Sequence, residues 1–201
     1  KNGMKKQEDI KKAIEKGHKR IVKRYLDKGF PVNAKIDGKR LGIIAILQDQ
    51  YSILELLLNN NQYRINQIDD DQPLHECSLL HVSVSQKRWD MVGLLKARGI
   101  NMQIASRNRG NILNLFVKEE RETLQILALG VLPDQFYRER LCKMGRLEVI
   151  QIISEQVPWF FKKDNLLQSI RYALNNPAIL FFLLDRPSIY MNPPQTRSLL
   201  M

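Results

Sequence analysis

The chain has 201 residues, of which 44% are hydrophobic and 26% charged, and its formal net charge is +11. This apolar fraction is enough to bury a core, so the composition excludes disorder over most of the chain. Ten Gly, eight Pro and two Cys exclude collagen-like material and a disulfide scaffold, which favours a reducing, intracellular compartment. No apolar run is long enough to span a bilayer.

The positive charge is concentrated at the N-terminal end. Residues 1–40 contain 14 basic and 5 acidic residues, a local charge of +9, whereas the other 161 residues carry only +2. Such asymmetry is typical of a docking surface for an acidic partner or of a heavily solvated terminus. Apolar residues interrupt the charges every three or four positions, which predicts amphipathic helices with Lys and Arg outside. These apolar residues are Ile10, Ala13, Ile14, Ile21, Val22, Tyr25 and Leu26.

A helical pattern then recurs along the chain at intervals near the roughly 33 residues of a helical repeat. Its six copies span residues 17–33, 37–66, 78–99, 110–130, 145–153 and 175–184. Equivalent apolar positions in successive copies are separated by 32, 38, 33, 25 and 30 residues. These positions are Ile21, Ile53, Met91, Leu124, Val149 and Ile179.

The first and third copies carry a resemblance to the ankyrin repeat. Residues 17–33 match the second half of that motif without a gap: a Gly-His turn, a helix beginning Ile-Val, a Gly and then Val-Asn. Residues 78–83, Ser-Leu-Leu-His-Val-Ser, stand where the family has Thr-Pro-Leu-His-x-Ala. In the second copy Asn61 replaces the helix-ending Gly, because Asn is the best substitute for Gly in a left-handed cap.

The resemblance covers residues 5–186 and implies an all-α ankyrin-repeat solenoid of about six helix-turn-helix units, forming one domain over residues 1–186. The long interval predicts an insertion near 68–77, and the short one predicts a clipped helix or turn near Pro133. Residues 187–201 are expected to form a C-terminal extension or to begin a further segment. The expected core includes Ile53, Leu56 and Leu57. Turn or helix-end glycines with positive φ are expected at Gly17, Gly29, Gly99, Gly130 and Gly145.

No catalytic constellation is evident in the sequence. His75, Cys77 and His81 lie close together, but a fourth zinc ligand at the usual spacing is missing, and the ankyrin pattern gives His81 a structural role. Cys142 has no neighbouring His to activate it and is predicted to be buried. No phosphate-binding Gly-rich loop or nucleophile motif occurs. We therefore expect no enzyme, no metal and no cofactor.

The resemblance implies a non-catalytic recognition module, whose partner lies in a concave groove formed by loop fingers and first helices. Six of the ten groove positions are basic and one is acidic, so the expected partner is an acidic protein segment. Trp159, which follows Pro158 in an expected loop, has a better claim to an exposed anchoring role than Trp89. The ten groove positions are Lys16, Asp37, Lys39, Gln48, His75, Gln86, Arg107, Arg109, Lys118 and Lys143.

Two alternatives stay open. Residues 1–40 would bind nucleic acid or an anionic membrane surface, although nucleic acid is disfavoured because Tyr25 is the only aromatic residue interleaved among the basic helical positions. In the second alternative, the chain is the targeting module of a larger enzyme whose catalytic domain lies outside these residues. The Lys-, Ile-, Asn- and Gln-rich repeats are similar to ankyrin effectors of intracellular bacteria, with viral and eukaryotic scaffold proteins as further sources. The expected location is cytoplasmic, in the host cell for an effector.

Overall fold

The computed structural model describes residues 2–162 and 164–185, so the predicted extension at 187–201 lies outside the described residues. The described chain is mostly α-helical and contains one small β-hairpin. It divides into two compact units, Lys1–Ser106 and Arg107–Met201. Within the described ranges, no helix combines the length and the apolar character that crossing a bilayer requires.

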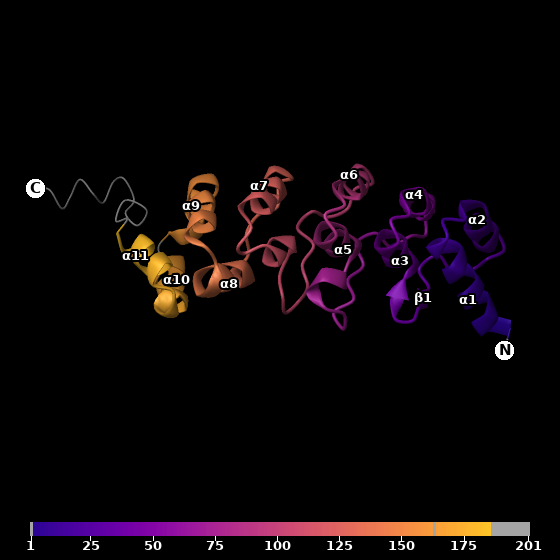
Figure 1. The fold of residues 1–201 in the computed structure, drawn as a ribbon, viewed down its shortest axis with the longest axis horizontal. Helices are drawn as coiled ribbons and strands as arrows, with labels where there is room; N and C mark the ends of the chain where they lie inside the picture. The colour runs from indigo at the N-terminus through magenta and orange to yellow at the C-terminus, as the bar shows by residue number, and fades with distance from the viewer. Residues whose placement is uncertain (1, 163, 186–201) are drawn as a thin grey trace, which may run out of the picture. The chain divides into compact units, whose positions relative to one another are not determined.

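Unit 1 contains three consecutive helical pairs (Figure 1). They are α1 (Asn2–Glu15) with α2 (Lys19–Asp27), α3 (Leu41–Leu47) with α4 (Tyr51–Leu58), and α5 (Leu79–Ser85) with α6 (Trp89–Ala97). The first helices contact one another in the order α1, α3, α5, and α2 contacts α4, so the pairs are stacked side by side. Helices of this length are marginal in isolation, and stacking supplies the apolar burial that stabilises them.

The same turn joins the two helices of each pair in unit 1. Its central residue has a positive φ: 71° at Gly17, 57° at Asp49 and 55° at Lys87. In each turn the next amide donates a 2.8 Å hydrogen bond to the carbonyl five residues earlier, as in a Schellman motif. The turns therefore recur at the intervals of 32 and 38 residues found in the sequence.

A two-stranded hairpin precedes α3 and corrects the expectation of an all-α fold. Strands β1 (Lys35–Ile36) and β2 (Lys39–Arg40) are antiparallel, with Lys35 opposite Arg40. The two turn residues have positive φ, 50° at Asp37 and 77° at Gly38. This is the geometry of a type I′ turn, for which Asp-Gly is a typical sequence signal.

The predicted insertion near 68–77 forms a loop between α4 and α5. The loop contains a short 3₁₀ helix, η1 (Leu74–Glu76), which packs against α5. The amide of Asp69 donates a 2.8 Å hydrogen bond to the carbonyl of Cys77, which closes the loop. The extra residues thus form an ordered projection at the end of α5.

Unit 2 repeats the paired arrangement with less regular elements. Its pairs are η2 (Ile112–Leu115) with α7 (Glu120–Ala128), α8 (Gln135–Met144) with α9 (Leu147–Gln156), and α10 (Asp164–Tyr172) with α11 (Pro177–Leu184). Contacts run from η2 to α8 to α10 and from α7 to α9 to α11. The connections carry two 3₁₀ helices, η3 (Pro158–Phe161) and η4 (Ala173–Asn175). The predicted turn near Pro133 is confirmed as a short link, 129–134, from α7 to α8.

Two of the predicted glycine-type positions are wrong. Among the described residues, the non-glycine positions with positive φ are Asp37, Asp49 and Lys87, so Asn61 is not a left-handed cap. Helix α4 ends instead in a right-handed cap at Asn59. Gly145 has a φ of −68°. Glycine is nevertheless required there, because a Cβ would overlap the carbonyl oxygen one turn earlier in α8. The expected positive φ is confirmed at Gly17, Gly29, Gly99 and Gly130.

The core follows the sequence pattern closely. Ile53 and Leu57 are fully buried, as predicted, whereas Leu56 is only half-buried. In α1 and α2, Ile10, Ala13, Ile14 and Val22 are buried. The amphipathic interpretation of the N-terminal end is therefore confirmed: its charges lie on packed helices.

Candidate functional site

Three of the predicted partner-binding residues occupy equivalent positions. Lys16, Gln48 and Gln86 each directly precede the positive-φ residue of a turn in unit 1, and all three are exposed. The structure therefore places them at the same end of three successive helical pairs. Lys16 makes no ion pair with a described residue, and Gln48 and Gln86 carry no charge.

Three others lie on the projections that precede α3 and α5, and we call them the finger residues. Asp37 is in the β1–β2 turn, Lys39 is on β2 and His75 is on η1. Lys11 Nζ lies 2.5 Å from Asp37 Oδ2. The hydrogen bond to Asp37 and the charge of its carboxylate raise the pKa of Lys11. Lys39 pairs with Glu76. The charges of Asp37 and Lys39 are thus already balanced within the protein.

The remaining predicted residues lie in unit 2. They are Arg107, Arg109, Lys118 and Lys143. Lys118 is exposed just before α7. Lys143 pairs with Glu139, and its Nζ lies 5.4 Å from the centroid of the Tyr172 ring. The ten predicted residues are therefore divided between the two units, six in the first and four in the second.

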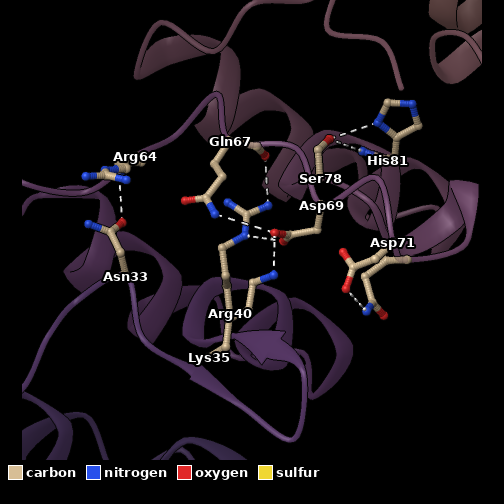
Figure 2. A network of polar contacts seen from close by, with 10 residues as sticks. Asn33, Lys35, Arg40, Arg64, Gln67, Asp69, Asp71, Ser78 and His81 are labelled. Atoms are coloured by element: carbon tan, nitrogen blue, oxygen red, sulfur yellow. Dashed lines mark hydrogen bonds and ion pairs between the residues drawn. The ribbon is translucent and has the colours of Figure 1, made fainter. Parts of the chain in front are cut away.

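A buried ion pair, which the sequence analysis missed, anchors the β1–β2 hairpin, the finger that precedes α3 (Figure 2). Arg40 Nε donates a 2.8 Å hydrogen bond to Asp69 Oδ2, and Arg40 Nη2 donates another to the carbonyl of Gln67 at 2.8 Å. Lys35 Nζ lies 2.7 Å from Asp69 Oδ1. Only 1% of the Arg40 side chain and 3% of the Asp69 side chain are exposed. The contacts tie the hairpin to the loop before α5.

The pKa of Asp69 reflects this environment. Burial by itself would raise the pKa, but the hydrogen bond from Lys35 and the charge and hydrogen bond of Arg40 outweigh it. The pKa of Asp69 therefore lies below its ordinary value. No sequence motif links Arg40 to Asp69, which lies 29 positions further along the chain. The one hint of a buried partner was the charged side chain of Arg40 in a segment bounded by the apolar residues Ile36 and Leu41.

Basic side chains without an ion pair to a described residue gather on α1, on α2 and in the segments that follow them. Most other basic residues of unit 1 are paired, such as Lys19 with Glu55 and Arg88 with Asp49. Outside the N-terminal stretch, Arg64 and Lys96 also lack such a pair. We call the gathered set the N-terminal basic surface; it comprises Lys5, Lys6, Lys16, Arg20, Arg24 and Lys28.

A cleft opens within the N-terminal basic surface. It has a volume of about 480 Å³ and is lined by α1, by α2 and by the segment after α2. The Tyr25 and Phe30 rings pack edge to face, with centroids 6.4 Å apart. We call this cavity the basic cleft; its lining residues are Lys6, Arg24, Tyr25, Lys28, Gly29, Phe30 and Pro31.

Most of the thiol and imidazole groups considered as catalytic or metal-binding candidates, namely Cys77, His81 and Cys142, are buried in the fold. His81 is buried, and its Nδ1 lies 2.8 Å from the hydroxyl of Ser78, which caps α5. Cys142 is buried, as predicted, and burial raises the pKa of its thiol to about 12. His75, by contrast, is exposed. Across the described ranges, no three His, Cys, Asp or Glu side chains are grouped to hold a metal ion.

Trp159 is exposed, as the sequence suggested, whereas Trp89 is half-buried. The indole of Trp159 packs edge to face on Phe160, with centroids 6.1 Å apart. Phe160 and Phe161 are themselves fully buried, so the cluster supports η3 from within and leaves only its Trp on the surface.

No protein-family model matches the chain, and no curated protein matches it either.

Proposed function

We propose that this chain is a non-catalytic protein-recognition module that binds an acidic segment of a partner through the N-terminal basic surface. The observation that carries the proposal is the distribution of unpaired charge. On the fingers, Lys39 has Glu76 as an internal counter-ion. On α1 and α2, Lys11, Lys12, Lys19 and Lys23 are also paired, but the six exposed cations of the N-terminal basic surface have no ion pair with a described residue. A cluster of unbalanced cations attracts an acidic partner over a Debye length and steers its approach.

The scaffold of this module is, in our proposal, an ankyrin-type solenoid of about six helical hairpins, three in each unit. The support lies in recurring local geometry. The Schellman turns repeat at the sequence intervals, and the Asn residues of the first two Val-Asn-type positions tie successive loops together. Asn33 accepts a 2.9 Å hydrogen bond from the amide of Arg64, and Asn66 accepts one of 2.7 Å from the amide of Asn101.

The ten groove residues stay a prediction, and the proposal ranks them by charge. Lys16 belongs both to that set and to the N-terminal basic surface, so it is expected to matter most. Lys39 and Lys143 contribute less attraction, because Glu76 and Glu139 already balance them.

The proposal is tested with a short synthetic peptide in which Glu alternates with small polar residues. Fluorescence anisotropy would measure its binding to the whole chain at low and at physiological salt. The double variant Lys16→Glu/Arg20→Glu should weaken binding at least tenfold, since both exposed cations become repulsive. Circular dichroism should be unchanged, because neither side chain is packed.

The matched control is Arg64→Glu/Lys96→Glu, which makes the same change of charge on exposed residues away from α1 and α2. Equal weakening by both double variants would reduce the effect to net charge and would contradict the proposal. A single-stranded DNA of equal charge addresses the alternative function. Tighter binding of DNA with a steep loss of affinity on adding salt would favour polyanion binding instead.

A further inference from the structure

We infer that the basic cleft is the specificity site of this module and takes an aromatic anchor residue within an acidic peptide segment. The inference rests on the proposed function and names the chemistry of the partner at that site. It follows from two features that lie side by side: an apolar floor of two aromatic rings and a rim of cations.

The floor is held in place by the end of α2. Gly29 has a φ of 84°, and the amide of Phe30 donates a 3.0 Å hydrogen bond to the carbonyl of Tyr25. This reversal places the Phe30 ring against the Tyr25 ring. The hydroxyl of Tyr25 donates a 3.2 Å hydrogen bond to Asp9, which fixes the other side of the floor. Both residues are half-buried and line the cleft, so part of each stays accessible to a ligand.

The rim of the cleft carries charge of one sign. Lys6, Arg24 and Lys28 line it, and no carboxylate does. None of the three makes an ion pair with a described residue. Carboxylates that flank an inserted ring would therefore meet three cations that make no ion pair inside the described chain, while Asp9 stays bound to the Tyr25 hydroxyl. An anchor in a desolvated apolar pocket, surrounded by polar contacts, is the usual organisation of a binding hot spot.

The hollow continues along the two helices, which suits a peptide better than a small molecule. A second depression of about 300 Å³ shares Arg24 and Tyr25 with the basic cleft and extends toward Lys12 and Lys16, with Asp9 as its one carboxylate among the described lining residues. Both volumes lie within the range of ligand pockets, roughly 300–1,000 Å³. The edge-to-face packing of the rings leaves no row of parallel faces on which successive nucleic-acid bases would stack.

The test is a double-mutant cycle on the whole chain. One acidic peptide carries a central Phe and a second carries Ala at that position. The wild-type chain should bind the Phe peptide more tightly, roughly tenfold or more, because the cleft buries the ring. In Phe30→Ala this preference should largely disappear, whereas Tyr51→Ala, which removes an exposed ring from α4, should keep it.

A second variant guards against misfolding of Phe30→Ala. Lys28→Glu changes an exposed rim residue and should weaken both peptides equally, leaving the preference for Phe intact. Intermolecular NOEs from the peptide ring to Tyr25 and Phe30 should be observed. Equal binding of the Phe and Ala peptides, with both still sensitive to Lys16→Glu/Arg20→Glu, would overturn this inference and leave the proposed function standing. Failure of every acidic peptide to bind would overturn both.

Discussion

At the level of single residues, the ion pair between Arg40 and Asp69 has the greatest structural consequence. Two opposite charges that water barely reaches gain a strong mutual attraction, but each has lost its hydration. Loss of either partner would destabilise the fold, because the remaining charge would be buried without a counter-ion. One nitrogen of Arg40, Nη1, already lacks a partner among the described residues, so the arrangement tolerates little further loss.

We predict that Asp69→Asn lowers the free energy of unfolding by about 3–5 kcal/mol, the cost of breaking a buried pair by removing one partner. Urea denaturation followed by circular dichroism would measure it. Asp71→Asn is the matched control, because Asp71 is an exposed carboxylate in the same loop, and it should change stability by less than about 0.5 kcal/mol. Equal effects of the two substitutions would show that the pair contributes no more than a surface charge.

The depressed pKa of Asp69 adds a pH dependence with a definite sign. Its folded pKa lies below the ordinary Asp value of about 3.9, so its stabilising contribution is complete above that pH. The contribution is lost as the pH falls through the lower, folded pKa. Acid unfolding curves of wild type and Asp69→Asn should therefore converge at low pH and diverge toward neutrality. A stability difference independent of pH would contradict this assignment.

At the level of elements, the connections differ more than the helices do. The pairs of unit 1 turn through a positive-φ residue, whereas α8 and α9 are joined through Gly145 with a negative φ and a close approach to the preceding helical turn. The α8–α9 turn lacks a positive-φ residue and is short, and the 129–134 link between α7 and α8 contains no hairpin or 3₁₀ helix. These two short connections account for the 25-residue interval between Leu124 and Val149.

We predict opposite effects for the same substitution at two glycines. Gly145→Ala should destabilise the protein by about 1–3 kcal/mol, because its Cβ would overlap the backbone of α8. Gly93→Ala should stabilise it by about 0.5–1 kcal/mol, since Gly93 is exposed within α6 and a Cβ there meets nothing. Thermal unfolding of both variants would measure the difference. A neutral Gly145→Ala would mean that the connection relaxes freely.

At the level of the whole molecule, the division into two compact units has a thermodynamic consequence. Stacked hairpins contact mainly their neighbours in sequence, so stability is expected to be a local property of each unit. In native-state hydrogen exchange, Asp69→Asn should lower the opening free energies of amides in α3 and α5 and leave those of α9 unchanged. An equal decrease in α9 would make the described chain one cooperative block.

Several features of the fold could be predicted from the sequence because their causes are local. Periodic apolar residues such as Ile53 and Leu57 gave the core, and Gly17, Gly29 and Gly99 marked turns that need a positive φ. The Asp37-Gly38 pair is likewise a local signal for the hairpin turn. Asn61 has the residue type of a left-handed cap, but α4 ends three residues earlier, at Leu58, with a right-handed cap at Asn59.

The candidate site was less accessible to sequence reasoning. The charge count located the basic end of the chain, but it could not separate cations with a counter-ion from those without one. In the sequence, Lys39 and Lys16 are two lysines with nothing to separate them. In the structure, Lys39 has Glu76 as a counter-ion, whereas Lys16 has no ion pair with a described residue. The pairing of Tyr25 with Phe30 likewise depends on the reversal at Gly29.

The amino-acid sequence alone therefore specifies a basic, helical, repeating chain, since helix periodicity, turn chemistry and net charge are properties of neighbouring residues. Contacts between residues far apart in the chain decide which charges are neutralised inside the protein and which remain available to a partner. Arg40 reaches Asp69 and Lys11 reaches Asp37 only when the fingers fold against their neighbours. Coulomb attraction depends on separation in space, which only the packed structure supplies.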